Sequence, residues 1–155
     1  MEHIIFNAAR TGDITTLKSL IEQGVDVDMR DLKGYTPLII ASYNHQLEAT
    51  RVLLEAKADV NAQDLGGNTA LMGVCFKGYP EIAELLIAQG ADLDMQHGNG
   101  GTALMFATMF GRNNLVRLIL KHGADKSKRE VRGLTAFDLA IQQGNHEALE
   151  ILEEF

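Results

Sequence analysis

A glycine-rich stretch, Gly98-Asn99-Gly100-Gly101-Thr102, is the segment of this sequence that most invites a chemical interpretation. Glycine-rich turns that lead into a helix can bind phosphate through backbone N–H groups. Here no lysine follows the glycines and no apolar strand precedes them, and the same register 33 residues earlier reads Leu65-Gly66-Gly67-Asn68-Thr69. Turn chemistry therefore accounts for the glycines, and we expect no nucleotide site and no small-molecule substrate.

Residues that could bind a metal or act as nucleophiles are scattered along the chain. The histidines are His3, His45, His97, His122 and His146. They lack the short spacing of metal ligands, and a single cysteine, Cys75, cannot form a thiolate cluster. We expect Cys75 to be a buried, unreactive thiol on the small-residue side of a helix. Acidic pairs such as Glu81 and Glu84 fall on solvated helix faces, so the sequence predicts no enzyme, no metal and no cofactor.

Composition places the chain among packed, acidic proteins. Of 155 residues, 46% are hydrophobic and 23% are charged, and the net charge is −7. A net negative charge disfavours bulk attraction to nucleic acid or to an anionic membrane. No apolar run approaches the roughly 18 residues of a membrane span. The first seven residues show neither a basic start nor a long apolar stretch, so we expect no signal peptide and a cytoplasmic location.

The elements that carry these residues repeat. Four threonines recur at intervals of 33 residues: Thr36, Thr69, Thr102 and Thr135. An apolar column keeps step with them: Leu38, Leu71, Leu104 and Phe137. Several columns with one period indicate five units within a single domain, 1–155. Their approximate bounds are 1–30, 31–63, 64–96, 97–129 and 130–155.

Each unit predicts two short helices and a projecting loop. Thr36 is a good N-cap, and Pro37 suits the first helical position, where a missing N–H costs nothing. Gly78 can end the first helix in the left-handed conformation, Pro80 begins the second, and Gly90 ends it. Isolated helices of fewer than about 12–15 residues are marginal in water, so each pair must bury its apolar side against the next copy.

These features resemble ankyrin repeats. The resemblance rests on the 33-residue period, the Thr36-Pro37-Leu38-x-x-Ala41 run and the Gly90-Ala91-Asp92 turn, and it covers residues 4–152. It implies an all-α solenoid of stacked helix-turn-helix units with projecting hairpin loops. The second unit departs from the pattern, because His45 and Lys57 replace its turn glycines. A non-glycine residue in the left-handed region costs about 1–2 kcal/mol, so we expect this unit to be the least well capped.

Two features near the end of the chain have a simple structural interpretation. The apolar pair that recurs near the end of each second helix becomes Leu152-Glu153, which is typical of a carboxy-terminal cap. Six basic residues also gather in a short window: Arg117, Lys121, Lys126, Lys128, Arg129 and Arg132. They either offset the acidic residues that follow or contact an acidic partner. The window lacks the stacking aromatics and the wider basic surface of a nucleic-acid site.

The resemblance implies that another protein binds across the first helices and the loop tips. The predicted partner-binding residues are Arg10, Lys33, Tyr35, Tyr43, Asn44, Asn68, Phe76, Lys77, Met109, Phe110, Gln142 and Gln143. Tyr43, Phe76, Met109 and Phe110 form an apolar centre with polar residues at both ends, as in a protein interface. Tyr43, Phe76 and Met109 lie four positions after Ile39, Met72 and Met105, and Phe110 follows Met109. We therefore expect one shared face, opposite the packed side of the helix.

Two alternatives remain open. The large apolar residues either pack against the loop of the adjacent repeat or face a partner. The binding interpretation predicts scaffolding, masking or inhibition of a partner protein, and the other interpretation is structural self-association of a monomer into a homo-oligomer. The sequence does not identify the partner, because ankyrin-like surfaces bind unrelated targets.

Overall fold

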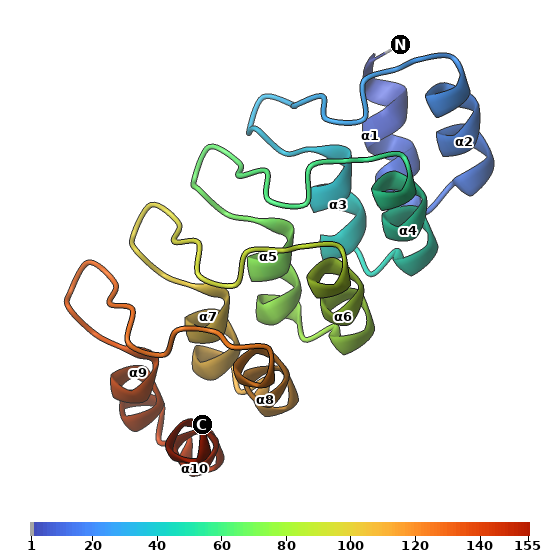
Figure 1. Ribbon diagram of the computed structural model, residues 1–155. Helices are drawn as coiled ribbons and strands as arrows, with labels where there is room; N and C mark the ends of the chain where they lie inside the picture. Colours follow the sequence, from blue (N-terminus) through green and yellow to red (C-terminus); the bar gives the residue numbers. More distant parts are fainter. Residues whose placement is uncertain (1) are drawn as a thin grey trace.

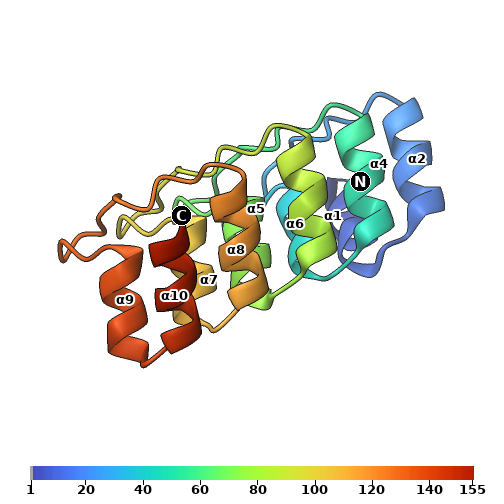
Figure 2. The ribbon, with the colours of Figure 1, turned by 60° about the horizontal axis from the view of Figure 1, so that its bottom comes forward.

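The computed structural model describes residues 2–155, with side chains from residue 4 onward, and this part of the chain forms ten helices and no strands. The inner row contains α1 (Glu2–Thr11), α3 (Pro37–Tyr43), α5 (Ala70–Lys77), α7 (Ala103–Met109) and α9 (Ala136–Gln143). The outer row contains α2 (Ile14–Glu22), α4 (Leu47–Glu55), α6 (Pro80–Ala88), α8 (Asn113–Lys121) and α10 (His146–Glu154). The two rows lie side by side, and the long loops all project from the same end of the inner row (Figures 1 and 2). The predicted all-α solenoid is confirmed.

The recurring threonines begin the inner helices from α3 onward. The hydroxyl of each threonine accepts a hydrogen bond from the backbone N–H three residues later, which satisfies one of the free donors at the helix start. Pro37 occupies the first position of α3, as its place in the sequence predicts. Because the same cap begins four successive inner helices, those helices start in register.

Left-handed residues make the tight turns after the helices. Gly78 (φ 86°) follows α5 and Gly90 (φ 93°) lies just after α6. In the second unit His45 (φ 62°) and Lys57 (φ 70°) adopt the same conformation without the freedom of glycine. The prediction that these two positions are left-handed is confirmed. The His45 ring stacks on the Tyr79 ring, with centroids 4.1 Å apart.

Contacts between successive repeats form the core. Inner-helix positions that face the next repeat are closed: Ile5, Leu38, Leu71 and Leu104 are 0–1% exposed, and Ala9, Ser42, Cys75 and Thr108 are 0% exposed. The same two positions of α9 are open, with Phe137 38% and Ile141 56% exposed. Leu152 is buried and Glu153 exposed, so the predicted cap holds for α10. It does not extend to α9, where large apolar side chains remain at the stacking positions.

Hydrogen bonds between neighbouring loops hold the loops in register. The Leu65 backbone N–H donates to the Lys33 carbonyl at 3.1 Å. Gln63 and Gln96, which share one register, each donate from Nε2 to a carbonyl of their own loop and to a carbonyl of the next. The loops therefore stand as a connected wall beside the inner helices. Within residues 2–155, no helix combines the length and the apolar character needed to cross a membrane.

Candidate functional site

Three aromatic side chains form a row across the inner helices. Tyr43 is 41% exposed, Phe110 is 43% exposed, and Phe76 lies half-buried between them. The Tyr43 and Phe76 rings are parallel with centroids 6.3 Å apart, and the Phe76 and Phe110 rings meet edge to face at 4.6 Å. The sequence placed these residues on one face, and the structure brings them into this aromatic row. They do not pack away beneath a loop.

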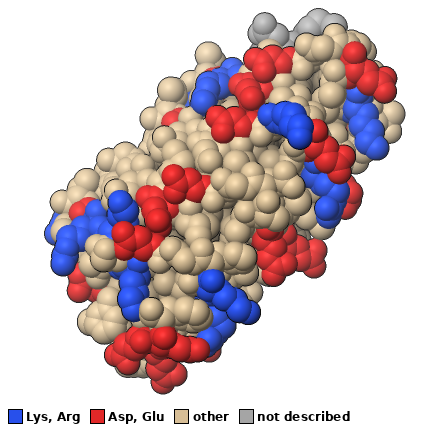
Figure 3. All heavy atoms as spheres, in the orientation of Figure 1, with Lys and Arg blue, Asp and Glu red and all other residues tan. Residues whose placement is uncertain are grey.

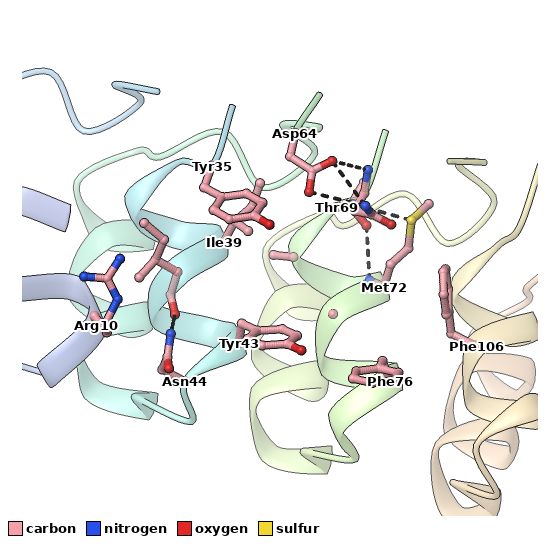
Figure 4. Close-up of a pocket in the computed structure, with 14 residues that line it drawn as sticks. Arg10, Tyr35, Ile39, Tyr43, Asn44, Asp64, Thr69, Met72, Phe76 and Phe106 are labelled. Carbon is pink, nitrogen blue, oxygen red and sulfur yellow. Dashed lines mark hydrogen bonds between the residues drawn. The ribbon is translucent and has the colours of Figure 1, made fainter. Parts of the chain in front are cut away.

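A cavity of about 450 Å³ opens beside the aromatic row, between the inner helices and the loop wall. We call it the central cavity. Its lining residues include Tyr43, Met72, Gly73, Phe76 and Phe106. In Figure 4 the Tyr43 and Phe76 rings lie at its lower side, and the Phe106 ring closes it from the neighbouring helix α7. The volume is within the range typical of ligand pockets, and the lining is largely apolar.

Gly73 keeps the central cavity open. It lies in the middle of α5, at the register where α3 has Ile40, α7 has Phe106 and α9 has Leu139. A helix-interior glycine costs about 1 kcal/mol relative to alanine. A Cβ added at Gly73 would lie 3.2 Å from the Tyr43 ring, closer than an ordinary contact. The missing side chain thus makes room both for Tyr43 and for the hollow beside it.

A second hollow of about 410 Å³ lies one repeat further along the stack. Phe106 separates it from the central cavity, because its ring lines both. His97 lines this hollow and meets Phe106 edge to face at 5.1 Å. The Nδ1 atom of His97 accepts the Gly101 backbone N–H at 2.9 Å, which is the turn role that Asp64 has in the preceding loop. His97 is therefore a turn residue.

The predicted partner-binding residues divide into three groups. Six of them line the central cavity: Arg10, Tyr35, Tyr43, Asn44, Asn68 and Phe76. Met109 lines the second hollow, and the Lys77 Nζ lies 5.0 Å from the centre of the Tyr43 ring. Lys33, Phe110, Gln142 and Gln143 are exposed and line neither hollow. Partner contact by these residues stays a prediction.

The expected face of the inner helices needs one correction. Ile39 and Met72 do line the central cavity together with Tyr43 and Phe76, and Met105 lines the second hollow, as the shared face predicts. That face is not free of packing, however, because each of the three is at most 9% exposed. They pack into the core under the loop wall, because helices this short bury more than one side. The Met72 sulfur even receives the Thr69 backbone N–H at 3.5 Å.

Sequence reasoning missed two kinds of site residue. Gly73 lines the central cavity and Phe106 lines both hollows, yet the register that they share shows no repeated residue type that would have singled it out. The loop tips also expose apolar side chains at one register, which a search for this column would have found: Leu32, Leu65 and Val131.

Most of the basic window is engaged within the chain. Arg117 forms an ion pair with Glu154 at 3.1 Å, and the Arg132 Nε lies 2.9 Å from Glu130. Lys126 and Arg129 donate to backbone carbonyls. The Arg117–Glu154 pair supports the interpretation that the window offsets the acidic end of the chain, and acidic side chains gather at the α10 end in Figure 3.

The acidic and thiol groups have structural environments. Desolvation alone would raise the pKa of Glu130, but hydrogen bonds from Arg132 and Leu134 outweigh it and lower the pKa. The backbone N–H of Thr135 lowers the pKa of Asp138 at the start of α9. Burial raises the pKa of the Cys75 thiol, as expected for an unreactive cysteine. Among the described side chains, no group of three or more His, Cys, Asp or Glu could hold a metal ion.

Comparison with known families agrees with this geometry. A family model described as ankyrin repeats (3 copies) matches residues 5–97 and 71–154. No curated protein matched the sequence. Ankyrin repeats are generally modules of protein–protein interaction and are typically not catalytic. The two matches together span nearly the whole solenoid, and the chain belongs to the ankyrin-repeat family.

Proposed function

We propose that this chain is a non-enzymatic binding module that holds a segment of another protein in the central cavity and along the aromatic row. It acts sterically, by masking, scaffolding or inhibiting that protein. The predicted cytoplasmic location is part of this proposal. The observation that carries it is the central cavity itself, about 450 Å³ in volume and kept open by Gly73 in the interior of α5, where glycine is a poor helix former.

The composition of this surface supports a protein partner. Exposed aromatic side chains offer a large contact area with few rotatable bonds, and such residues dominate the energetics of interfaces. The aromatic row has Arg10 and Asn44 on one side and Gln142 and Gln143 on the other. An apolar centre with a polar rim is the usual anatomy of a protein–protein interface.

The test compares proteins retained by the tagged full chain in extracts of its own cells. Phe76→Glu places a charge in the aromatic row, and Thr15→Glu adds the same charge on the exposed first turn of α2. Circular dichroism establishes that both variants are folded. We expect at least one protein to be retained by the wild type and by Thr15→Glu but lost from Phe76→Glu. Identical retention by all three forms contradicts the proposal, and retention of only a second copy of this chain supports self-association instead.

A further inference from the structure

Charge is distributed unequally between the two rows of helices. The outer helices carry nine glutamates and four lysines or arginines. From residue 4 onward, the inner helices carry only three charged residues: Arg10, Lys77 and Asp138. A chain of net charge −7 therefore presents almost no acid along its inner row.

Four carboxylates in the loops and at the start of α9, among them Asp64, which lines the central cavity, accept hydrogen bonds from the backbone. Asp31 and Asp64 each accept two backbone N–H groups of their own loop turn. Glu130 does the same in the last loop and also receives the Arg132 side chain. Asp138 accepts the Thr135 backbone N–H at the start of α9. These acids stabilise turns and helix caps by accepting hydrogen bonds from the backbone of those segments.

The cations of the inner row are placed differently. Arg10 lines the central cavity, and among the described side chains it has neither an ion pair nor a side-chain hydrogen bond. The Lys77 Nζ lies over the Tyr43 ring at 5.0 Å without a carboxylate partner in the same described set. The basic window, by contrast, is largely bonded within the chain. Within the described residues, Arg10 and Lys77 therefore place positive charge without a carboxylate partner beside the aromatic row.

We infer that the segment bound at the central cavity is acidic and carries a large apolar side chain, which enters the cavity while its carboxylates face Arg10 and Lys77. This inference rests on the proposed function and names its partner class. The apolar lining fits the anchor, and the cations fit the flanking acids. Basic segments are disfavoured, because they would meet Arg10 and Lys77, and Asp64, which also lines the cavity, already accepts two backbone N–H groups of its own loop.

The probe is a library of random dodecapeptides displayed on phage and selected against the immobilised full chain. We expect the enriched peptides to carry net negative charge and at least one aromatic or large aliphatic residue. A labelled enriched peptide is then titrated by fluorescence anisotropy. Its affinity should fall as sodium chloride rises from about 0.05 to 0.5 M, because salt screens exposed charges.

Charge-reversal variants show which cations contribute to the affinity for the enriched peptide. Lys77→Glu and Arg10→Glu should each weaken the peptide about tenfold, whereas Lys18→Glu on the outer helix α2 should change affinity by less than about twofold. Enriched peptides that are neutral or basic, or equal weakening by all three variants, overturn the inference. If enriched neutral or basic peptides lose binding to Phe76→Glu, the proposed function at the central cavity stands and only the acidic partner class is wrong. If Phe76→Glu binds them as the wild type does, the proposed function fails as well.

Discussion

Lys57 adopts a backbone conformation that glycine takes at the same register of three other repeats. Its φ is 70°, and the equivalent residues are Gly24, Gly90 and Gly123. His45 is also left-handed, but its ring gains a stacking contact with Tyr79, so its replacement would remove a favourable interaction. Lys57 is exposed and makes no such contact among the aromatic pairs of the described residues, which makes it the better test of backbone strain.

We predict that Lys57→Gly stabilises the chain by about 1 kcal/mol, which corresponds to a Tm increase of about 2–4 °C in a chain of this size. Thermal unfolding followed by circular dichroism measures the shift. Gly90→Lys is the reverse control, since an added Cβ there meets nothing within 4 Å and only backbone strain remains. An unchanged or lower Tm for Lys57→Gly contradicts the argument from strain.

Glu130 gives the last loop a dependence on pH. Hydrogen bonds from Arg132 and Leu134 stabilise its carboxylate and lower its pKa below the ordinary 4.5, so the folded state binds fewer protons than the unfolded state. The stabilisation is present above pH 4.5 and is lost as the pH falls below that value. Tm should therefore decrease more steeply in the wild type than in Glu130→Gln between about pH 4.5 and 2.5. If Tm depends on pH in the same way in the two proteins, Glu130 does not cause the loss of stability at low pH.

The caps and the turns of the helices could be predicted from the sequence, because they depend on residues close together in the chain. Threonine before a helix and a left-handed position after it are readable locally, as Thr36 and Lys57 show. The central cavity could not be predicted in this way. It arises because Gly73 lacks a side chain at a register where Phe106 has a large one, and the consequence appears only when α5 and α7 lie side by side.

The end of the inner row shows the same limit at the level of one helix. Glu153 indicated a polar cap, and the exposure of Ile141 shows that α9 is open at the position where α5 has the buried Cys75. The two side chains occupy equivalent places in helices of equal length. Only the presence of a following repeat distinguishes their surroundings.

Equivalent substitutions at these two positions should therefore have unequal effects. We predict that Ile141→Gln changes the free energy of unfolding by less than about 0.5 kcal/mol, because the side chain is largely in water. Cys75→Gln should lower it by at least about 2 kcal/mol, since a larger amide would be forced into a closed contact without a hydrogen-bond partner. Urea unfolding measures both, and similar losses for the two variants would contradict the assignment of α9 as an open helix.

At the scale of the whole molecule, stability depends on contacts between neighbouring repeats. Each inner helix contacts the next inner helix, and each outer helix the next outer helix, from one end of the stack to the other. In such arrays the free energy is approximately a sum of repeat and neighbour terms. A central pair such as α5 and α6 is held from both sides, whereas α9 and α10 have a neighbouring repeat on one side within the described residues.

This asymmetry predicts where the molecule opens first. Leu152 is 2% exposed in α10, so Leu152→Ala removes buried packing from the last pair of helices, while the hydrogen bond from Lys126 to the backbone carbonyl of residue 152 is retained. A leucine-to-alanine change in a core costs about 2–5 kcal/mol. That loss should release α9 and α10 alone, and hydrogen–deuterium exchange should accelerate there while protection in α5 and α6 is retained. Leu86→Ala, at a fully buried position of α6, should instead accelerate exchange on both sides of the substitution, because it weakens two junctions at once. If both variants accelerated exchange uniformly along the chain, the stack would unfold as one cooperative unit. The small effect predicted for Ile141→Gln in α9 would then need another explanation.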